Sequence, residues 1–477
     1  MRTFLILAVV VLSACARNAE PGDVPPGEAM SRVTAGLRSE LTVHGRPAPE
    51  AFSLAERMAH YKVPGVSIAV VEGGRIAWAH GFGVREAGAA DPVTAATLFQ
   101  AASISKPVAA TGMLRMVDEG RLALDTPVNE YLVRWKVPDN EFTAREKVTL
   151  RRLASHSAGL TVHGFGGYRA GTPVPSVPQI LDGNGPANSA PVRVDAVPGS
   201  FWRYSGGGVT IEQLVMTDVA KEPFPALMRR LVLEPVGMTN STFEQPLPEG
   251  RHGAAASGHD GDGEAIPGRW HVYPEMAAAG LWTTPADLLK WAMEIAAARE
   301  GRSNRVLSRS IATAMLTPQK GTSGLGPSLG GRGNGFYFSH GGSNAGFRAQ
   351  LIYFPETGQG AAVMANAEGG DRLAREILLA ISAAYGWPGY GEIRPLAMSA
   401  GALDRHTGEY AITAPYRTTM KFTREGSRLI KEATPLLGPR EEVVFTAPGL
   451  ARGVQSGIEY TFHADRVELL GLTLTRR

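Results

Sequence analysis

Two pairs of apolar runs with the pattern of β-strands lie far apart along the chain. The first pair covers residues 65–71 and 75–83, and Glu72-Gly73-Gly74 between them is a hairpin signal. The second pair covers residues 347–354 and 360–366, with a short turn between the two runs. We therefore expect two antiparallel hairpins, one near each end of a single domain.

Helical and turn patterns complete this prediction. A helix is expected over 371–385, and helix-forming sequence fills most of the region between the hairpins. This order predicts an α/β (α+β) fold over residues 50–390, in which one antiparallel sheet is flanked by helices. Beyond it, short alternating runs such as 418–422 and 459–462 are separated by turn residues, so residues 400–477 should form a small all-β domain, a barrel or sandwich.

The amino-terminal segment has the pattern of a secretion signal. Residues 4–12 are apolar and follow Arg2, a run too short to span a bilayer but typical of a secretory leader. The sequence Leu12-Ser13-Ala14-Cys15 resembles the bacterial lipobox, in which the cysteine is lipidated. Cys15 is also the only cysteine, and a lone thiol in an oxidising compartment is best explained by lipidation. We therefore expect residues 1–14 to be a lipoprotein signal peptide, with an ordinary signal peptide as the alternative.

The residues after Cys15 fit the same interpretation. Residues 15–49 are rich in Pro, Gly and small polar residues, which predicts a tether between the membrane and the folded domain. The expected location is the cell envelope, with attachment to the membrane through the lipid on Cys15. Ala16, in place of Asp, is the lipoprotein pattern associated with the outer membrane in Gram-negative bacteria.

Composition narrows the function further. A net charge of +3 over 477 residues, without a basic cluster, gives no indication of nucleic-acid binding. A small-molecule or peptide substrate fits better. His, Cys, Asp and Glu residues do not occur at metal-ligand spacing, so neither a metal nor another cofactor is expected.

The most informative motif is Ser103-Ile104-Ser105-Lys106, at the start of an apolar-periodic segment. On a helix, residues i and i+3 share one face, so the Lys106 amine is expected beside the Ser103 hydroxyl. A helix start also offers free N–H groups to a developing negative charge. A pocket that desolvates Lys106 would lower its pKa towards neutrality and let it act as a base. Alone, the motif is weak, because one chance match of this spacing is expected in many chains.

Two further segments make it specific: Tyr204-Ser205-Gly206, and His340-Gly341-Gly342-Ser343 between two strand-like runs. With these, the chain resembles the serine β-lactamase and penicillin-binding protein superfamily, and most closely its class C-like branch of esterases and D-amino-acid peptidases, which carries S-x-x-K, Y-x-N and then K-T-G or H-x-G. Supporting segments include residues 118–128, 153–160, 234–238 and 279–284. Residues 407–410 are similar to the opening of the lipocalin-like appendages of this family.

The resemblance implies a role for each motif. Ser103 is the nucleophile, and Lys106 and Tyr204 form the pair from which the base comes; which of the two accepts the proton is left open. The backbone N–H groups of Ser103 and Ser343 would form the oxyanion hole.

His340 takes the place of the first residue of the third motif. Gly341 and Gly342 beside it would let a substrate lie against the strand. A histidine here predicts an activity that titrates between about pH 5 and 8. The remaining histidines, His156 and His163 among them, are interpreted as ordinary surface or core residues.

Gly206 departs from the family pattern, because it stands where Y-x-N has an asparagine whose amide contacts the lysine and the substrate. We expect a serine hydrolase that forms an acyl-enzyme on an ester, an amide or a D-amino-acid peptide. A true β-lactamase or D,D-carboxypeptidase is the same-class alternative. A non-catalytic penicillin-binding-like receptor or scaffold is the alternative from another class.

Overall fold

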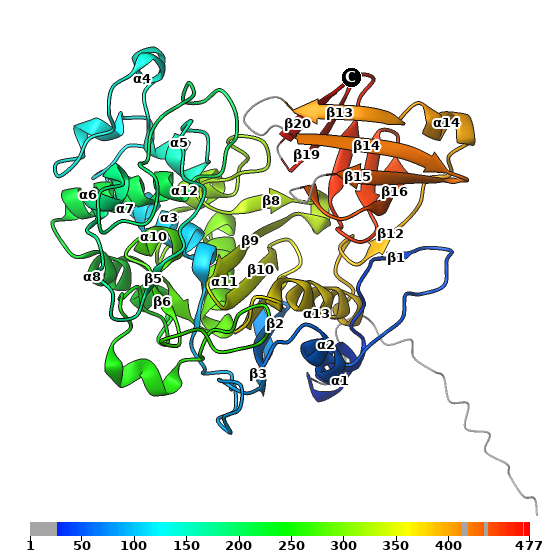
Figure 1. Ribbon diagram of the computed structural model, residues 1–477, viewed down its shortest axis with the longest axis horizontal. Helices are drawn as coiled ribbons and strands as arrows, with labels where there is room; N and C mark the ends of the chain where they lie inside the picture. The colour runs from blue at the N-terminus through cyan, green and yellow to red at the C-terminus, as the bar shows by residue number, and fades with distance from the viewer. Residues whose placement is uncertain (1–25, 413–417, 434–436, 471) are drawn as a thin grey trace, which may run out of the picture.

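The computed structural model describes residues 26–412, 418–433, 437–470 and 472–477 (Figure 1). The expected signal peptide and Cys15 lie outside the described residues. Within them, no helix is both long and apolar enough to cross a membrane.

A six-stranded antiparallel sheet forms the centre of the larger domain, in the order β3-β2-β11-β10-β9-β8. The predicted hairpins from the two ends of the domain meet where β2 pairs with β11, with Ala69 opposite Ala362. The sheet predicted from both termini is therefore confirmed. Its strands are β2 (Gly65–Glu72), β3 (Arg75–Gly83), β8 (Ser328–Gly330), β9 (Tyr337–Asn344), β10 (Phe347–Phe354) and β11 (Gln359–Ala365).

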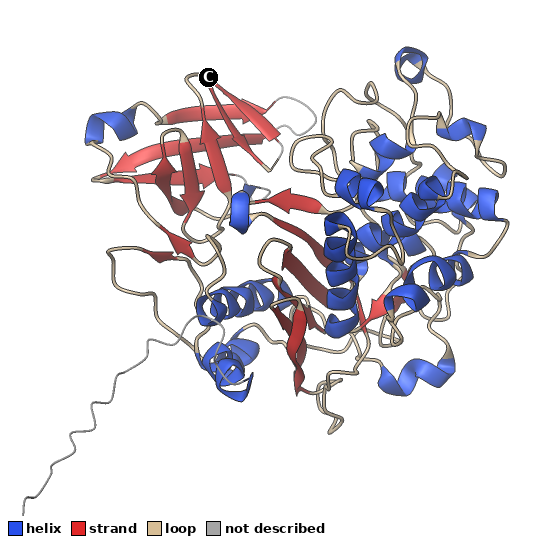
Figure 2. Cartoon of the chain, turned by 180° about the vertical axis from the view of Figure 1, so that it is seen from behind, coloured by secondary structure: helices blue, strands red, loops and turns tan. Residues whose placement is uncertain are grey.

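Helices cover both faces of this sheet (Figures 1 and 2). One face packs against α13 (Gly370–Tyr385), and the other packs against α11 (Pro285–Glu300). Beyond α11 lies the helical part of the domain, which Figure 2 shows on the side away from the barrel. Its helices are α3 (Ser105–Asp118), α4 (Glu141–Arg145), α5 (Leu150–Ala154), α6 (Val177–Asp182), α7 (Gly206–Ala220), α8 (Phe224–Met228), α9 (Glu234–Val236), α10 (Met276–Ala279) and α12 (Arg309–Met315).

Short strand pairs tie this helical region together and connect segments near the two ends of the larger domain. They are β4 (Phe99–Gln100) with β7 (Trp282–Thr283), β5 (Tyr168–Arg169) with β6 (His271–Val272), and β1 (Thr42–Val43) with β12 (Glu392–Ile393).

The tether prediction is wrong from residue 26 onward. Residues 26–35 form helix α1 (Pro26–Ala35), which packs with α13, and α2 (Leu54–His60) follows. Val33 and Leu37 are fully buried. These apolar side chains outweigh the Pro- and Gly-rich composition that suggested a tether, since burying each one stabilises the fold by about 1.5–3 kcal/mol. The larger domain therefore begins before residue 50.

The carboxy-terminal residues form a closed eight-stranded β-barrel, which confirms the predicted all-β domain. It follows α14 (Ala400–Asp404), and inward-facing aromatic side chains such as Phe422 and Phe462 fill its core. Its strands are β13 (Gly408–Ile412), β14 (Thr418–Glu425), β15 (Arg428–Ala433), β16 (Glu441–Ala447), β17 (Leu450–Gly453), β18 (Glu459–Phe462), β19 (Arg466–Leu469) and β20 (Leu472–Arg476).

The barrel lies next to β8 at the edge of the central sheet (Figure 1). An apolar cluster that includes Leu41 and Val454 joins it to the larger domain, and Arg46 binds both carboxylate oxygens of Glu442. A cleft of about 830 Å³ remains between the two domains, lined by Trp202 and Ser339 on one side and by residues of β18–β20 on the other.

Candidate active site

Ser103 sits in a single 3₁₀ turn, Ala102–Ile104, that leads directly into α3. The preceding residue, Ala102, has a left-handed backbone with a φ of +48°. Such a conformation is uncommon for a residue with a side chain and is typical of functional turns. The predicted position of Ser103 at a helix start is confirmed.

Lys106 lies one turn further on, and its Nζ is 2.9 Å from Ser103 Oγ and 2.8 Å from the carbonyl oxygen of Ala278. The side chain is buried and forms no ion pair with a described acidic residue. Burial lowers the pKa of Lys106 to about 7, because the charged ammonium is poorly solvated there. A substantial fraction of this amine is therefore neutral at physiological pH and able to accept the Ser103 proton.

Tyr204 precedes α7, whose first turn is capped by the side chain of Ser205. Its hydroxyl interacts with the Ser103 side chain, and its ring lies 4.9 Å from Lys106 Nζ. Burial raises the pKa of Tyr204 far above its usual value, so the phenol stays protonated. The sequence left Tyr204 and Lys106 equally eligible as the base; the geometry and these pKa directions favour Lys106.

His340 points from β9 to the same place, with its ring 6.2 Å from that of Tyr204. Its Nδ1 donates to the carbonyl oxygen of Gly341 at 2.7 Å, which leaves Nε2 without a proton when the ring is neutral. Burial, together with the nearby Lys106, lowers the pKa of His340 to about 4. The titration expected between pH 5 and 8 is therefore wrong for this residue, because its burial was not visible in the sequence.

The strand edge beside His340 is open to a ligand. Among the described residues, β8 pairs only with the first part of β9, up to Ser339, so the outer edge of β9 has no strand partner from His340 to Asn344. Ser343 is exposed on this edge. The oxyanion role of the Ser103 and Ser343 N–H groups stays a prediction.

Packing around Gly341 and Gly342 explains the two glycines of this strand without the expected substrate contact. A Cβ on Gly342 would lie 2.2 Å from the carbonyl oxygen of Ala101, so the turn that carries Ser103 occupies that space. A Cβ on Gly341 would lie 3.1 Å from the side-chain Nε2 of Gln350. Gly342 is thus required for the close packing of β9 against the turn that carries Ser103.

Gly206 is also tightly surrounded. A Cβ there would lie 3.1 Å from the carbonyl oxygen of His163 and 3.2 Å from Cε2 of Phe165. The loop around residues 163–165 thus fills the space in which the family's asparagine side chain would begin. The expected role of Gly206 in substrate binding stays a prediction.

The structure adds two histidines that the sequence interpretation set aside. The ring of His156 lies 4.3 Å from the Tyr204 ring, and that of His163 lies 4.8 Å from it. Burial and the nearby Lys106 lower the pKa of both histidines. A signal for His156 was present, since it lies in the segment 153–160 that supported the family resemblance.

These groups are arranged for acyl transfer. A serine hydroxyl, a desolvated amine and a protonated phenol meet beside an open strand edge. Within the part of the chain that the structure describes, no group of His, Cys, Asp and Glu side chains is placed to hold a metal ion. The fold is an antiparallel sheet flanked by helices, and its site holds the groups that a serine hydrolase needs.

Comparison with known proteins gives the family. The sequence profile of the Beta-lactamase family matches residues 53–385, and the protein belongs to this family. Among curated proteins it is similar to Esterase EstB from Burkholderia gladioli, with 32% identity over 196 residues, which cover 39% of this chain and 48% of EstB. The match thus spans about half the length of that relative.

Solved structures show the same fold at low sequence identity. The octameric penicillin-binding protein homologue from Pyrococcus abyssi superposes with a TM-score of 0.56 at 22% identity, covering 89% of this chain and 98% of that one. D-amino acid amidase from Ochrobactrum anthropi superposes with a TM-score of 0.55 at 21% identity, covering 69% and 99% of the two chains.

Proposed function

We propose that the protein hydrolyses esters through an acyl-enzyme on Ser103, with Lys106 as the base. The observation that carries this proposal is the 2.9 Å contact between Lys106 Nζ and Ser103 Oγ, at an amine whose pKa is lowered to about 7. In the first step, Ser103 Oγ bonds to the substrate carbonyl carbon while its proton passes to Lys106. The oxyanion is held by backbone N–H groups at the helix start and on β9.

Collapse of this intermediate breaks the bond to the leaving group, which takes the proton back from the Lys106 ammonium. The protonated hydroxyl of Tyr204, which interacts with the Ser103 side chain, relays that proton. Water then repeats the sequence on the acyl-enzyme, again giving its proton to neutral Lys106, and releases the acid.

The preference for esters rests on Gly206 and its neighbours. The site lacks the amide side chain that would bind a substrate's acylamido group, and Phe165 occupies the adjacent space. A hydrogen bond left unmade costs about 1–3 kcal/mol, or roughly tenfold to a hundredfold in kcat/KM. An activated ester needs this contact less than a β-lactam or a peptide does. The name of the relative EstB, an esterase, points in the same direction.

Hydrolysis of an amide or a D-amino-acid substrate is the second candidate, because D-amino acid amidase shares the fold. A β-lactamase or D,D-carboxypeptidase activity, and a receptor without turnover, remain the alternatives to be tested.

The experiment is a substrate panel with an active-site label. A fluorophosphonate probe should label the parent protein and fail to label Ser103→Ala. The kcat/KM for p-nitrophenyl butyrate should exceed that for a chromogenic cephalosporin and for a D-amino acid amide. A higher value for the cephalosporin would establish the β-lactamase alternative, and absence of both label and turnover would establish the receptor alternative.

We also propose that the protein is exported and anchored by a lipid on Cys15. The support is the sequence 12–15 and the absence of a second cysteine. Expressed with its own leader in a bacterium, the protein should incorporate labelled palmitate and sediment with membranes. Palmitate incorporation that persists in Cys15→Ser would contradict the anchor.

A further inference from the structure

His156 lies in a tightly held turn at the end of α5. Its backbone is left-handed, with a φ of +55°. The hydroxyls of its two neighbours, Ser155 and Ser157, are 3.0 Å apart in the protein interior and fasten the turn across His156. A side chain larger than Gly or Asn is uncommon in this conformation, so the turn must be held by its surroundings.

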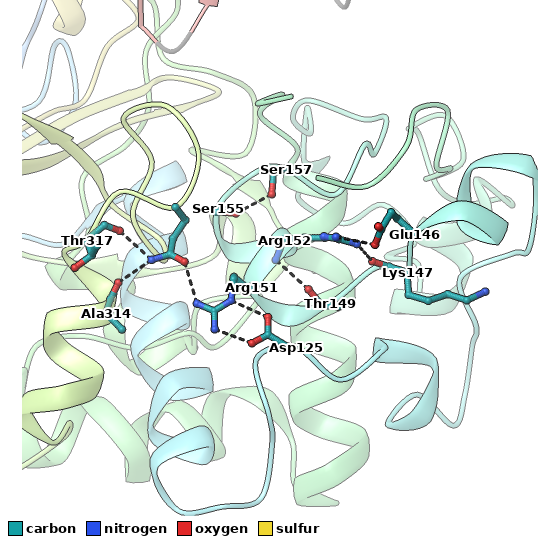
Figure 3. Close-up of polar contacts among 11 residues, drawn as sticks. Asp125, Glu146, Lys147, Thr149, Arg151, Arg152, Ser155, Ser157, Ala314 and Thr317 are labelled. Carbon is teal, nitrogen blue, oxygen red and sulfur yellow. Dashed lines mark hydrogen bonds and ion pairs between the residues drawn. The ribbon is translucent and has the colours of Figure 1, made fainter. Parts of the chain in front are cut away.

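The helix that ends in this turn is itself anchored (Figure 3). Arg151 binds both carboxylate oxygens of Asp125 and donates to Gln319 at 2.9 Å. Arg152 pairs with Glu146 at 2.9 Å. The base of the His156 turn is therefore fixed to three separate segments of the chain.

His156 in turn holds both residues that flank Tyr204. Its carbonyl oxygen accepts the N–H of Arg203 at 2.8 Å, and its Nδ1 accepts the N–H of Ser205 at 3.3 Å. Between these two contacts, the Tyr204 ring lies against the imidazole, with the ring centres 4.3 Å apart and the planes 36° from each other. One residue thus fixes the backbone on both sides of Tyr204 and supports one face of its phenol.

We propose that His156 is the positioning residue that keeps the Tyr204 hydroxyl on Ser103 during hydrolysis. This inference rests on the proposed function, in which Tyr204 relays the proton of the leaving group. His156 does not touch the reacting atoms, and it acts through Tyr204 alone.

The protonation state of His156 is part of this assignment. Nδ1 can accept the Ser205 N–H only when it carries no proton. The groups that face the imidazole are Lys106, His163, His340 and Tyr204. Burial is the main cause that holds the pKa of His156 well below its usual value, and Lys106, His340 and His163 oppose protonation of the ring further whenever they carry a charge. The site therefore keeps His156 in the neutral form that holds Ser205.

Two substitutions of His156 distinguish the effect of losing its Nδ1 hydrogen-bond acceptor from the effect of changing its left-handed backbone. Asn and Gly both tolerate a left-handed backbone, but only Asn carries a side-chain oxygen near the position of Nδ1. With p-nitrophenyl butyrate, His156→Gly should lower kcat about a hundredfold with KM changed by less than about threefold. His156→Asn should recover kcat to within about tenfold of the parent. Lys221→Asn, at another left-handed position with a φ of +55°, controls for the substitution itself and should leave kcat unchanged.

The decisive measurement places His156→Gly in a Tyr204→Phe background. If His156 acts through the Tyr204 hydroxyl, adding His156→Gly to Tyr204→Phe should lower kcat by less than about twofold. The reason is that the hydroxyl that His156 positions is already absent. The proposal would be overturned if the fold losses in kcat from Tyr204→Phe and His156→Gly multiplied fully in the double variant. It would also be overturned if His156→Gly and His156→Asn lost kcat equally, or if only KM changed. These outcomes differ from those expected if the proposed function itself is wrong. In that case Tyr204→Phe alone would keep full activity, or the fluorophosphonate would not label Ser103.

Discussion

Gly342 of β9 faces the carbonyl oxygen of Ala101 so closely that a Cβ would lie 2.2 Å from it. The contact joins the third motif to the turn that carries Ser103, the proposed nucleophile. Since both partners at this contact are backbone, neither can turn aside as a flexible side chain can. The distance between Ser103 and the open edge of β9 therefore depends on Gly342 having no side chain.

Gly342→Ala should push the Ser103 turn away from β9. We expect kcat/KM to fall about a hundredfold, because a displacement of about 1 Å in an active site has that effect, and the free energy of unfolding to fall by about 1–3 kcal/mol. Gly341→Ala is the matched control, since its Cβ meets only the movable Gln350 side chain at 3.1 Å. Equal activities in the two variants would show that the contact does not position the nucleophile.

The activity should depend on pH through Lys106. Because burial lowers the pKa of Lys106 to about 7, kcat/KM should fall about tenfold per pH unit below that value and level off above it. His340, whose pKa is lowered to about 4, stays neutral over this range, so His340→Gln should keep the midpoint. Burial raises the pKa of Glu275 to about 7 as well, and Glu275→Gln should also keep it. If the midpoint of the pH profile moved in either variant, the titrating group would be the substituted residue rather than Lys106.

Tyr204→Phe should lower kcat about a hundredfold through loss of the proton relay, while the midpoint near pH 7 remains. The reason is that burial raises the pKa of Tyr204 so far that the phenol does not titrate in the working range. The check is the full pH profile of the variant against the parent. Disappearance of the midpoint in Tyr204→Phe would mean that the phenol, rather than the amine, is the base.

Replacing Gly206 by the family's asparagine should not restore β-lactam recognition by itself. The new Cβ would lie 3.1 Å from the His163 carbonyl oxygen and 3.2 Å from Phe165, so Gly206→Asn should lower kcat/KM for ester and cephalosporin alike. Adding Phe165→Ala removes the ring from that space, and the double variant should raise the ratio of cephalosporin to ester kcat/KM by about tenfold. A full shift of the ratio in Gly206→Asn alone would show that the 163–165 loop moves aside at little cost.

Much of this fold could be predicted from the sequence because its strands show a clear pattern of apolar residues and turns. Apolar alternation and turn residues placed both hairpins of the sheet, α13 and the barrel. The packing of the amino-terminal segment onto the domain was missed because it depends on a few buried side chains, Val33 and Leu37 among them, and composition does not show which residues are buried.

The site divides in a similar way. Ser103 and Lys106 share one helix face by their spacing, and Tyr204 and His340 were found because their motifs resemble those of the family. The sequence does not show burial, and burial sets the pKa of His340 and of Tyr204. It also does not show that His156 approaches Tyr204, since that contact depends on how two distant loops pack.

Lys106 should also make the stability of the protein depend on pH. In the native state its pKa is lowered to about 7, whereas in the unfolded chain it returns to 10.5. Between these values the unfolded state binds one more proton than the native state, so the free energy of unfolding rises with pH, by at most about 1.4 kcal/mol per pH unit. Lys106→Met removes this contribution, and the difference in unfolding free energy between parent and variant, measured by urea unfolding, should grow in favour of the parent from pH 7.5 to pH 9. Ser103→Ala is the inactive control, because it keeps the buried amine and should keep the parent's slope. Identical slopes in the parent and Lys106→Met would show that Lys106 is not desolvated enough to act as the neutral base on which the proposed mechanism depends.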